Sequence, residues 1–255
     1  MRTIAFTNQK GGVGKSTSCI NIASILGNIG KRVLIIDLDP QANSTTGLGI
    51  KLNELEGKTT VYECITDEVP ISEVMIKTEF ENVYIVPSYI TLANAEIEIA
   101  SMMGRESLLK DSIKKCDLES KFDFILLDLP PTLGLLSVNG LTASTDVFIP
   151  IDAGIFAISG INQLLSIINM IKRKLNPDLN ICGVLFTKVV KTNFSKELYT
   201  NLENIFKDKI FKTIIHQSVK IPEAQSYNQP INYYNKSCKS ALEYIEATKE
   251  LLSRI

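Results

Sequence analysis

The chain has 255 residues, of which 45% are hydrophobic and 22% are charged. This composition supplies a large buried core and excludes an intrinsically disordered chain. The net charge of −1 by itself argues neither for nor against nucleic-acid binding, and no apolar run reaches the roughly 18 residues that a membrane-spanning helix needs.

The N-terminal stretch reads as a strand, a glycine loop and a helix. Residues 3–6 form a short, mostly apolar run that predicts a strand, and residues 18–26 form an amphipathic run that predicts a helix. Between them lies the sequence NQKGGVGKST, residues 8–17. Because the chain enters this first strand at once, we also expect no signal peptide.

The glycine loop has the composition of a phosphate-binding loop. Its glycines permit backbone conformations in which amide N–H groups approach phosphate oxygens, and the following helix adds its positive end. We assign nucleotide contacts to seven consecutive residues: Gly11, Gly12, Val13, Gly14, Lys15, Ser16 and Thr17. Lys15 supplies a charge for the β- and γ-phosphates, and Ser16 supplies a hydroxyl ligand for Mg²⁺.

The loop departs from the strict pattern G-x-x-x-x-G-K-[ST] at its first position. Gln9 stands where glycine is expected, and an additional lysine, Lys10, precedes the glycines. A glycine-rich turn that only joins a strand to a helix is the alternative. The length of the motif and its position between strand and helix favour a phosphate site.

Two stretches further along combine a buried strand with a terminal carboxylate. Residues 33–36 are continuously apolar and lead into Asp37 and Asp39, and residues 124–127 lead into Asp128. In open α/β sheets, ligands bind at the carboxyl ends of parallel strands. Asp128 therefore reads as a Walker B carboxylate near Mg²⁺. Asp39 is assigned a functional role, whereas Asp37 is equally consistent with a polar turn.

The remaining elements continue the alternation of helices and strands. Helices are expected at residues 61–65, 71–75, 92–103, 108–116, 155–175, 194–206 and 241–252, and strands at residues 83–86, 146–151, 179–186 and 210–215. No linker or repeat interrupts them. The pattern predicts a single α/β domain over residues 1–255, with a mostly parallel twisted sheet flanked by helices on both faces.

The distribution of lysines and the cysteine spacing give weaker indications of binding partners and of the cellular compartment. Residues 186–239 contain nine lysines and four acidic residues, a net charge of +5, which is consistent either with a basic face for phosphates or with ordinary solvated lysines. Five scattered cysteines without Cys-x-x-Cys spacing predict reduced thiols in a cytoplasm. The single histidine, His216, is expected to be structural.

These motifs together resemble the ParA/Soj family of partition ATPases, within the wider group that includes MinD and has a deviant Walker A loop. The resemblance covers nearly the whole chain. It is carried by KGGVGKST at residues 10–17, DLDPQAN at 37–43 and ILLDLPPTLG at 125–134, with a weaker match, SVKIPEAQSYNQPI, at 218–231.

The resemblance implies an ATPase that uses ATP/ADP and Mg²⁺ and works as a homodimer in its ATP state. Lys10 is similar to the signature lysine that reaches the nucleotide of the partner subunit, and Asp39 to the carboxylate that activates water. Lys15, Ser16 and Asp128 keep the roles given above. Such a protein is expected to be cytoplasmic and nucleoid-associated, to bind DNA without sequence preference and to have a ParB-like centromere-binding partner.

Two departures from the family pattern fall at positions that relatives use near the adenine base and for non-specific DNA contact. Relatives have Pro-Arg-Asn where this chain has His216-Gln217-Ser218, and an arginine where it has Lys220. Lysine keeps the charge but not the fork geometry of arginine. Lys188, Lys191 and Lys220 are the DNA-binding candidates. A helix-turn-helix extension of the kind found in some plasmid relatives is not expected.

Two other functions use the same fold. A MinD-like membrane ATPase requires a basic amphipathic helix at its end, but residues 241–252 include Glu243, Glu246 and Glu250, which anionic lipid would repel. We therefore expect that helix to dock on the protein and expect no membrane partner. A reductase related to the nitrogenase iron protein requires cysteines near the DLPPTLG loop, which contains none.

Overall fold

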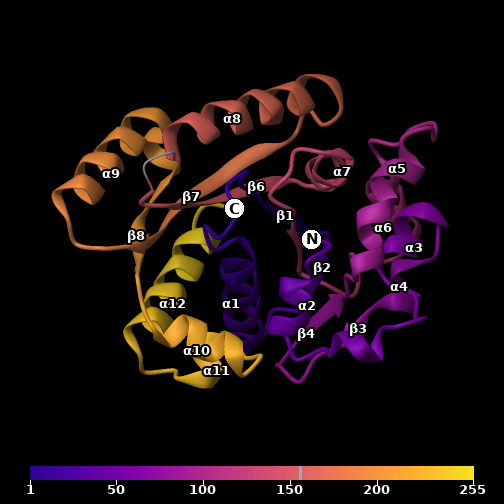
Figure 1. Cartoon of the computed structure of the whole chain (residues 1–255), viewed down its shortest axis with the longest axis horizontal. Helices are drawn as coiled ribbons and strands as arrows, with labels where there is room; N and C mark the ends of the chain where they lie inside the picture. The colour runs from indigo at the N-terminus through magenta and orange to yellow at the C-terminus, as the bar shows by residue number, and fades with distance from the viewer. Residues whose placement is uncertain (155–156) are drawn as a thin grey trace.

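The computed structural model describes residues 1–154 and 157–255, and its strands form one sheet (Figure 1). The spatial order is β3-β4-β2-β5-β1-β6-β7-β8. All neighbouring strands run parallel except β3 and β4, which are antiparallel. The strand bounds are β1 (Arg2–Phe6), β2 (Val33–Asp37), β3 (Ile76–Lys77), β4 (Val83–Val86), β5 (Phe124–Asp128), β6 (Asp146–Asp152), β7 (Asn180–Val189) and β8 (Ile210–His216).

Helices occupy the connections between strands. The α-helices are α1 (Lys15–Asn28), α2 (Asn43–Gly47), α3 (Val61–Thr66), α4 (Ile71–Val74), α5 (Ala95–Ile99), α6 (Leu108–Lys115), α7 (Leu135–Ala143), α8 (Ala157–Lys174), α9 (Asn193–Phe206), α10 (Lys220–Ser226), α11 (Ile231–Tyr234) and α12 (Lys239–Leu252). Short 3-10 turns lie at Leu52–Glu54, Ile90–Asn94 and Lys207–Lys209.

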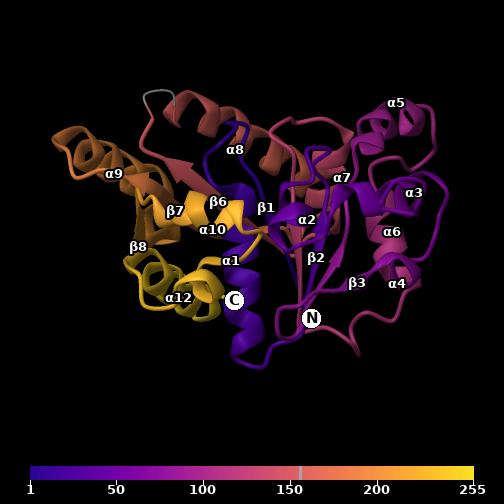
Figure 2. The ribbon, with the colours of Figure 1, turned by 60° about the horizontal axis from the view of Figure 1, so that its bottom comes forward.

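Alternating strand residues divide the core into two layers. In β2, Leu34 and Ile36 pack with the helices on one face of the sheet, and Val33 and Ile35 pack on the opposite face. Helices α3 to α9 cover the first face, and α1 with α10 to α12 covers the second (Figure 2). Every central strand is therefore buried on both sides, which explains why these strands read as continuous apolar runs.

The predicted fold class is confirmed, with several differences in the elements. The helix expected at 92–103 ends at Ile99, because residues 90–94 form a 3-10 turn and residues 100–106 form turns and a bend. The short strand β3, the helix α7 after the DLPPTLG loop and the short helices α2, α10 and α11 were not predicted. The expected start of the helix at 155–175 lies outside the described residues, and the helix is described from Ala157.

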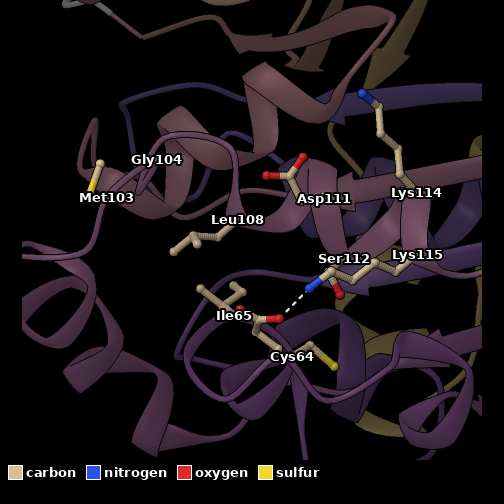
Figure 3. A pocket seen from close by; sticks show the side chains of 10 residues that line it. Cys64, Ile65, Met103, Gly104, Leu108, Asp111, Ser112, Lys114 and Lys115 are labelled. Atoms are coloured by element: carbon tan, nitrogen blue, oxygen red, sulfur yellow. Dashed lines mark hydrogen bonds and ion pairs between the residues drawn. The ribbon is translucent and has the colours of Figure 1, made fainter.

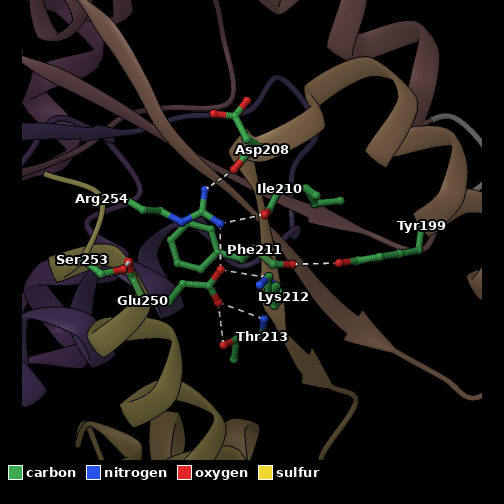
Figure 4. Close-up of polar contacts among 9 residues, drawn as sticks. All are labelled: Tyr199, Asp208, Ile210, Phe211, Lys212, Thr213, Glu250, Ser253 and Arg254. Atoms are coloured by element: carbon green, nitrogen blue, oxygen red, sulfur yellow. Dashed lines mark hydrogen bonds and ion pairs between the residues drawn. The ribbon is translucent and has the colours of Figure 1, made fainter.

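Helix α12 docks along the free edge of β8, as Figure 4 shows. The carboxylate of Glu250 accepts hydrogen bonds from the backbone N–H groups of Lys212 (2.9 Å) and Thr213 (3.0 Å). Arg254 donates to the carbonyl oxygens of Asp208 (2.7 Å) and Ile210 (2.8 Å). These two side chains thus satisfy backbone groups that an edge strand would otherwise expose.

Candidate nucleotide site

The loop between β1 and α1 depends on glycine at two positions. Gly12 has a φ of +74° and Gly14 a φ of +90°, in the left-handed region that other residues rarely adopt. Gly14 directly precedes α1, which begins at Lys15. The positive end of α1 and its first N–H groups therefore face the space that the loop encloses.

Two side chains, one from the loop itself and one from β7, fix this loop to the neighbouring strands. Asn8 donates to the carbonyl of Pro150 in β6 (2.7 Å) and accepts a hydrogen bond from the N–H of Lys10 (3.0 Å). Thr187, in β7, donates to the carbonyl of Val13 (2.7 Å). The loop is thus held in one conformation by the ends of strands on the side of β1 opposite to β5.

A cavity of about 690 Å³ opens over the loop. Its volume is within the usual range for small-molecule sites of about 300–1,000 Å³. Gly11, Gly12, Gly14, Lys15, Ser16, Thr17 and Asp39 line one part of it, and Lys188, His216, Gln217, Ser218, Gln225 and Tyr244 are among those that line the rest. The cavity therefore joins the phosphate loop, the β2 edge and the ends of β7 and β8. Of the predicted loop residues, Val13 is buried and does not line the cavity.

Asp37 and Asp128 are paired in register on adjacent strands, and both are fully buried. Asp37 accepts hydrogen bonds from the N–H and hydroxyl of Thr45 (both 2.8 Å). Asp128 accepts one at Oδ2 from Ser44 (2.7 Å), and its Oδ1 has no hydrogen-bond partner. Asp37 is thus occupied with holding α2, whereas Asp128 keeps a free oxygen.

Burial sets the ionisation of the charged groups beside the loop. It raises the pKa of Asp128 to about 6, although the nearby hydroxyls of Ser16 and Ser44 and the charge of Lys15 act in the opposite direction. It also lowers the pKa of Lys15, against the attraction of Asp128 and Asp39. Burial therefore disfavours the charged forms of both Asp128 and Lys15. A divalent cation bound with nucleotide phosphates would stabilise these charged forms, because the cation attracts the carboxylate and the phosphates attract the ammonium group.

The donor set around Asp128 fits Mg²⁺. The free Oδ1 of Asp128 and the hydroxyl of Ser16 are hard oxygen ligands, which this ion prefers. Within residues 1–154 and 157–255, no group of three or more His, Cys, Asp or Glu side chains could hold a metal ion. The arrangement suits an ion that takes one or two protein oxygens and completes its coordination with phosphate and water.

Asp39 is held in place beside the phosphate loop, in the same cavity. It is buried, yet it lines the cavity. Its Oδ1 accepts a hydrogen bond from the N–H of Gln41 (3.0 Å), and its carbonyl accepts one from the hydroxyl of Ser88 (2.8 Å). A carboxylate held in this position can orient a water molecule beside bound phosphates.

Lys10 does not line the cavity. Its ammonium nitrogen lies 2.8 Å from both carboxylate oxygens of Asp152, at the end of β6. Gly154 lies against this ammonium and has no room for a Cβ atom there. Within one chain, Lys10 is therefore directed away from the site that Lys15 and Ser16 form.

The three lysines proposed for DNA lie in three different settings. Lys188 lines the phosphate-loop cavity. Lys191 lines a separate cavity of about 890 Å³ between the ends of β7 and β8 and helix α9. Lys220 forms an ion pair with Glu223 one turn further along α10 (2.7 Å). The structure does not gather these lysines into one site.

Sequence patterns did not indicate several residues that shape the cavity. Gln225 donates to the hydroxyl of Thr17 (2.9 Å), and Tyr244 lies 3.2 Å from the hydroxyl of Ser18. Thr187 reaches the loop from a strand more than 170 residues away. Ser44 and Thr45 directly follow DLDPQAN, and Gln225 lies within the weaker motif at 218–231, so these three residues did carry a local signal.

A third cavity, of about 490 Å³, lies between α3 and α6 (Figure 3). Cys64, Leu108, Ser112 and Lys115 are among its lining residues, and Lys115 pairs there with Glu68 across the opening. None of the phosphate-loop residues reaches it. In the described part of the chain, no helix is long and apolar enough to cross a membrane.

Comparisons with known proteins agree with this site. A family model described as an AAA domain matches residues 1–181. The sporulation initiation inhibitor protein Soj of Bacillus subtilis (strain 168) is 39% identical over 98% of this chain and 98% of its own length. The chromosome-partitioning ATPase Soj of Treponema pallidum (strain Nichols) is 37% identical over 99% of this chain and 98% of its own length.

A solved structure supports the identity of the ligand. Cobyrinic acid a,c-diamide synthase from Mycobacterium smegmatis, crystallised with an ATP analogue and magnesium, superposes with a TM-score of 0.85. It is 32% identical and the match covers 99% of this chain and 94% of that one. The same fold thus holds an adenine nucleotide and magnesium in that protein.

Proposed function

Since the chain belongs to the Soj/ParA family of partition ATPases, we propose that it segregates DNA by a cycle of ATP-dependent dimerisation, DNA binding and slow hydrolysis. It is an ATPase whose cofactors are ATP/ADP and Mg²⁺. The observation that carries the proposal is the cavity that the phosphate loop and Asp39 line, with the buried Asp128 close enough to Lys15 to interact with its charge. We take residues 1–255 as a single domain of this type.

Within one chain, the protein residues bind and orient the nucleotide. The loop N–H groups and Lys15 bind the phosphates, and Asp39 orients the attacking water. Ser16 and Asp128 would hold the magnesium ion, which when bound would neutralise charge on the phosphates. Phosphoryl transfer depends mainly on such positioning and charge compensation, so these residues account for the chemistry.

Lys10 is the residue through which one subunit would act on the nucleotide of the other. In the structure, this lysine contacts Asp152 rather than its own cavity. We propose that Lys10 leaves Asp152 and contacts the nucleotide of the partner in the ATP-bound homodimer. Since the extra positive charge arrives only on dimerisation, hydrolysis is slow in the monomer and coupled to assembly.

In the proposed cycle, the ATP-bound dimer is the form that binds DNA. We propose that lysines of the C-terminal third, among them Lys191 and Lys220, contact DNA phosphates without reading sequence. Lys220 is available because its exposed ion pair with Glu223 contributes little and is readily exchanged for a phosphate. The protein would then be cytoplasmic, associate with the nucleoid and respond to a ParB-like partner.

The packing of α12 favours DNA over a membrane as the surface that the protein binds. Tyr244 and Leu251 of this helix are buried in the core, and Glu250 is hydrogen-bonded to β8. A membrane-binding helix has to present its apolar face to lipid. Here that face is already covered by α1 and β8.

The proposal is tested by measuring DNA affinity and ATP turnover together. We expect binding to random-sequence duplex to require ATP and to weaken steeply with salt, and turnover to rise when DNA and the partner are added. Lys15→Ala is the control, because it should lose nucleotide binding and all of these responses. DNA affinity that is independent of ATP or of salt would contradict the mechanism.

A further inference from the structure

Lys188 occupies an irregular position at the end of β7. Phe186 pairs with Ile214 of β8, and the next pair joins Val189 with His216. Three steps along β7 therefore match two along β8, which is a β-bulge with one additional residue. Bulges of this kind occur next to active sites, where they redirect a side chain.

The backbone at this bulge is unusual for lysine. Lys188 has a φ of +52°, in the left-handed region that favours glycine. The residues on both sides are buried: Thr187 donates to the carbonyl of Val13 in the phosphate loop, and Val189 packs in the core. The neighbours thus hold the bulge in place while Lys188 itself stays exposed.

The position of Lys188 points to a ligand in the cavity of the phosphate loop. Lys188 lines that cavity, as do His216 and Gln217 at the end of β8. The N–H of Gln217 donates to the carbonyl of Val189 (3.0 Å). The ends of β7 and β8 are therefore hydrogen-bonded to each other where they border the cavity. Lys191, three residues further on, lines the neighbouring cavity and does not reach this one.

We propose that Lys188 contacts the bound nucleotide and is not part of the DNA-binding surface. An ammonium group on a flexible stem can donate hydrogen bonds to phosphate and ribose oxygens, and it adds a positive charge to the cavity that Lys15 also lines. The bulge and the left-handed backbone direct a cation to the nucleotide. The inference rests on the proposed nucleotide site but does not require DNA binding.

The test compares Lys188→Met, at the end of β7, with Lys191→Met, a matched change three residues further along the chain. ADP with Mg²⁺ is the probe, because it binds without the γ-phosphate and so without dimerisation. We expect Lys188→Met to weaken ADP affinity about tenfold, as the loss of a hydrogen bond to a charged group does, and Lys191→Met to leave it unchanged. Lys188→Arg should retain most of the affinity because it retains the charge.

Unchanged ADP affinity in Lys188→Met would overturn the inference, as would an equal loss in Lys191→Met. Circular dichroism of each variant establishes that it is folded. DNA affinity is measured separately with saturating ATP, where we expect only Lys191→Met to weaken it. If the wild-type protein bound no DNA, the proposed partition function would fail, and the ADP comparison would still decide the role of Lys188.

Discussion

The ammonium nitrogen of Lys10 lies 2.8 Å from both carboxylate oxygens of Asp152 within the same chain. The side chains are 39% and 18% exposed, respectively, so water already weakens this ion pair. A pair of this kind typically contributes about 0–1 kcal/mol. It can therefore hold Lys10 while the protein is monomeric and still be given up when phosphate oxygens of a partner become available.

Asp152→Asn should favour the ATP-bound dimer, because it removes the carboxylate that competes for Lys10. We expect dimers to form at a severalfold lower protein concentration, measured by analytical ultracentrifugation with ATP and Mg²⁺. The same substitution in a Lys10→Ala background should have no effect on dimerisation. An equal shift in both backgrounds would show that Asp152 acts independently of Lys10.

Asp39→Ala should separate assembly from turnover. The carboxylate lines the cavity but is not needed to bind phosphates, so the variant should form ATP-dependent dimers and bind DNA while losing hydrolysis. Phosphate release and DNA retention are measured on the same preparation. Normal turnover in this variant would remove Asp39 from the water-activating role.

Asp128→Asn should stabilise the nucleotide-free protein at neutral pH. The pKa of Asp128 is raised from 3.8 to about 6, so the folded state binds this proton more tightly than the unfolded chain does. The carboxylate therefore destabilises the folded state increasingly as the pH rises from about 4 to 6, by an amount on the order of 2–3 kcal/mol above that range.

Chemical denaturation of Asp128→Asn and wild type at pH 4 and pH 7.5 measures this effect. The stability gain should be present at pH 7.5 and largely absent at pH 4. Binding of ADP should become less dependent on Mg²⁺ in the same variant. A gain that is equal at both pH values would mean that it does not arise from the ionisation of Asp128.

Glu250→Ala should destabilise the protein through the edge of β8. It leaves the N–H groups of Lys212 and Thr213 without their acceptor and leaves Arg254 without its carboxylate, at a cost of about 2 kcal/mol. The matched control is Glu246→Ala on the same helix, whose exposed pair with Lys249 should contribute less than about 0.5 kcal/mol. Urea denaturation measures the free energy of unfolding of the two variants. An equal loss of stability in both would contradict the docking role of Glu250.

The phosphate loop and the strands that lead into Asp39 and Asp128 could be predicted because their signals are local. Glycines at fixed spacing, and apolar runs that end in a carboxylate, are consequences of the same short-range geometry that places them at one sheet edge. The helix expected at 92–103 was wrong beyond Ile99, because apolar spacing does not tell where turns replace helix. Helix α7 was missed since its residues are buried almost all round and show little helical periodicity.

The sequence by itself thus determined the fold class and located the glycine loop and the strands that lead into Asp39 and Asp128, whose roles stay predictions. The tertiary structure decided which groups meet across long separations: Lys10 with Asp152, Val13 with Thr187 and Asp128 with Ser44. It also separated Lys188 from Lys191, which look alike in the sequence but line different cavities because one extra residue bulges from β7. Such pairings depend on strand order and register, and no local pattern of residues encodes them.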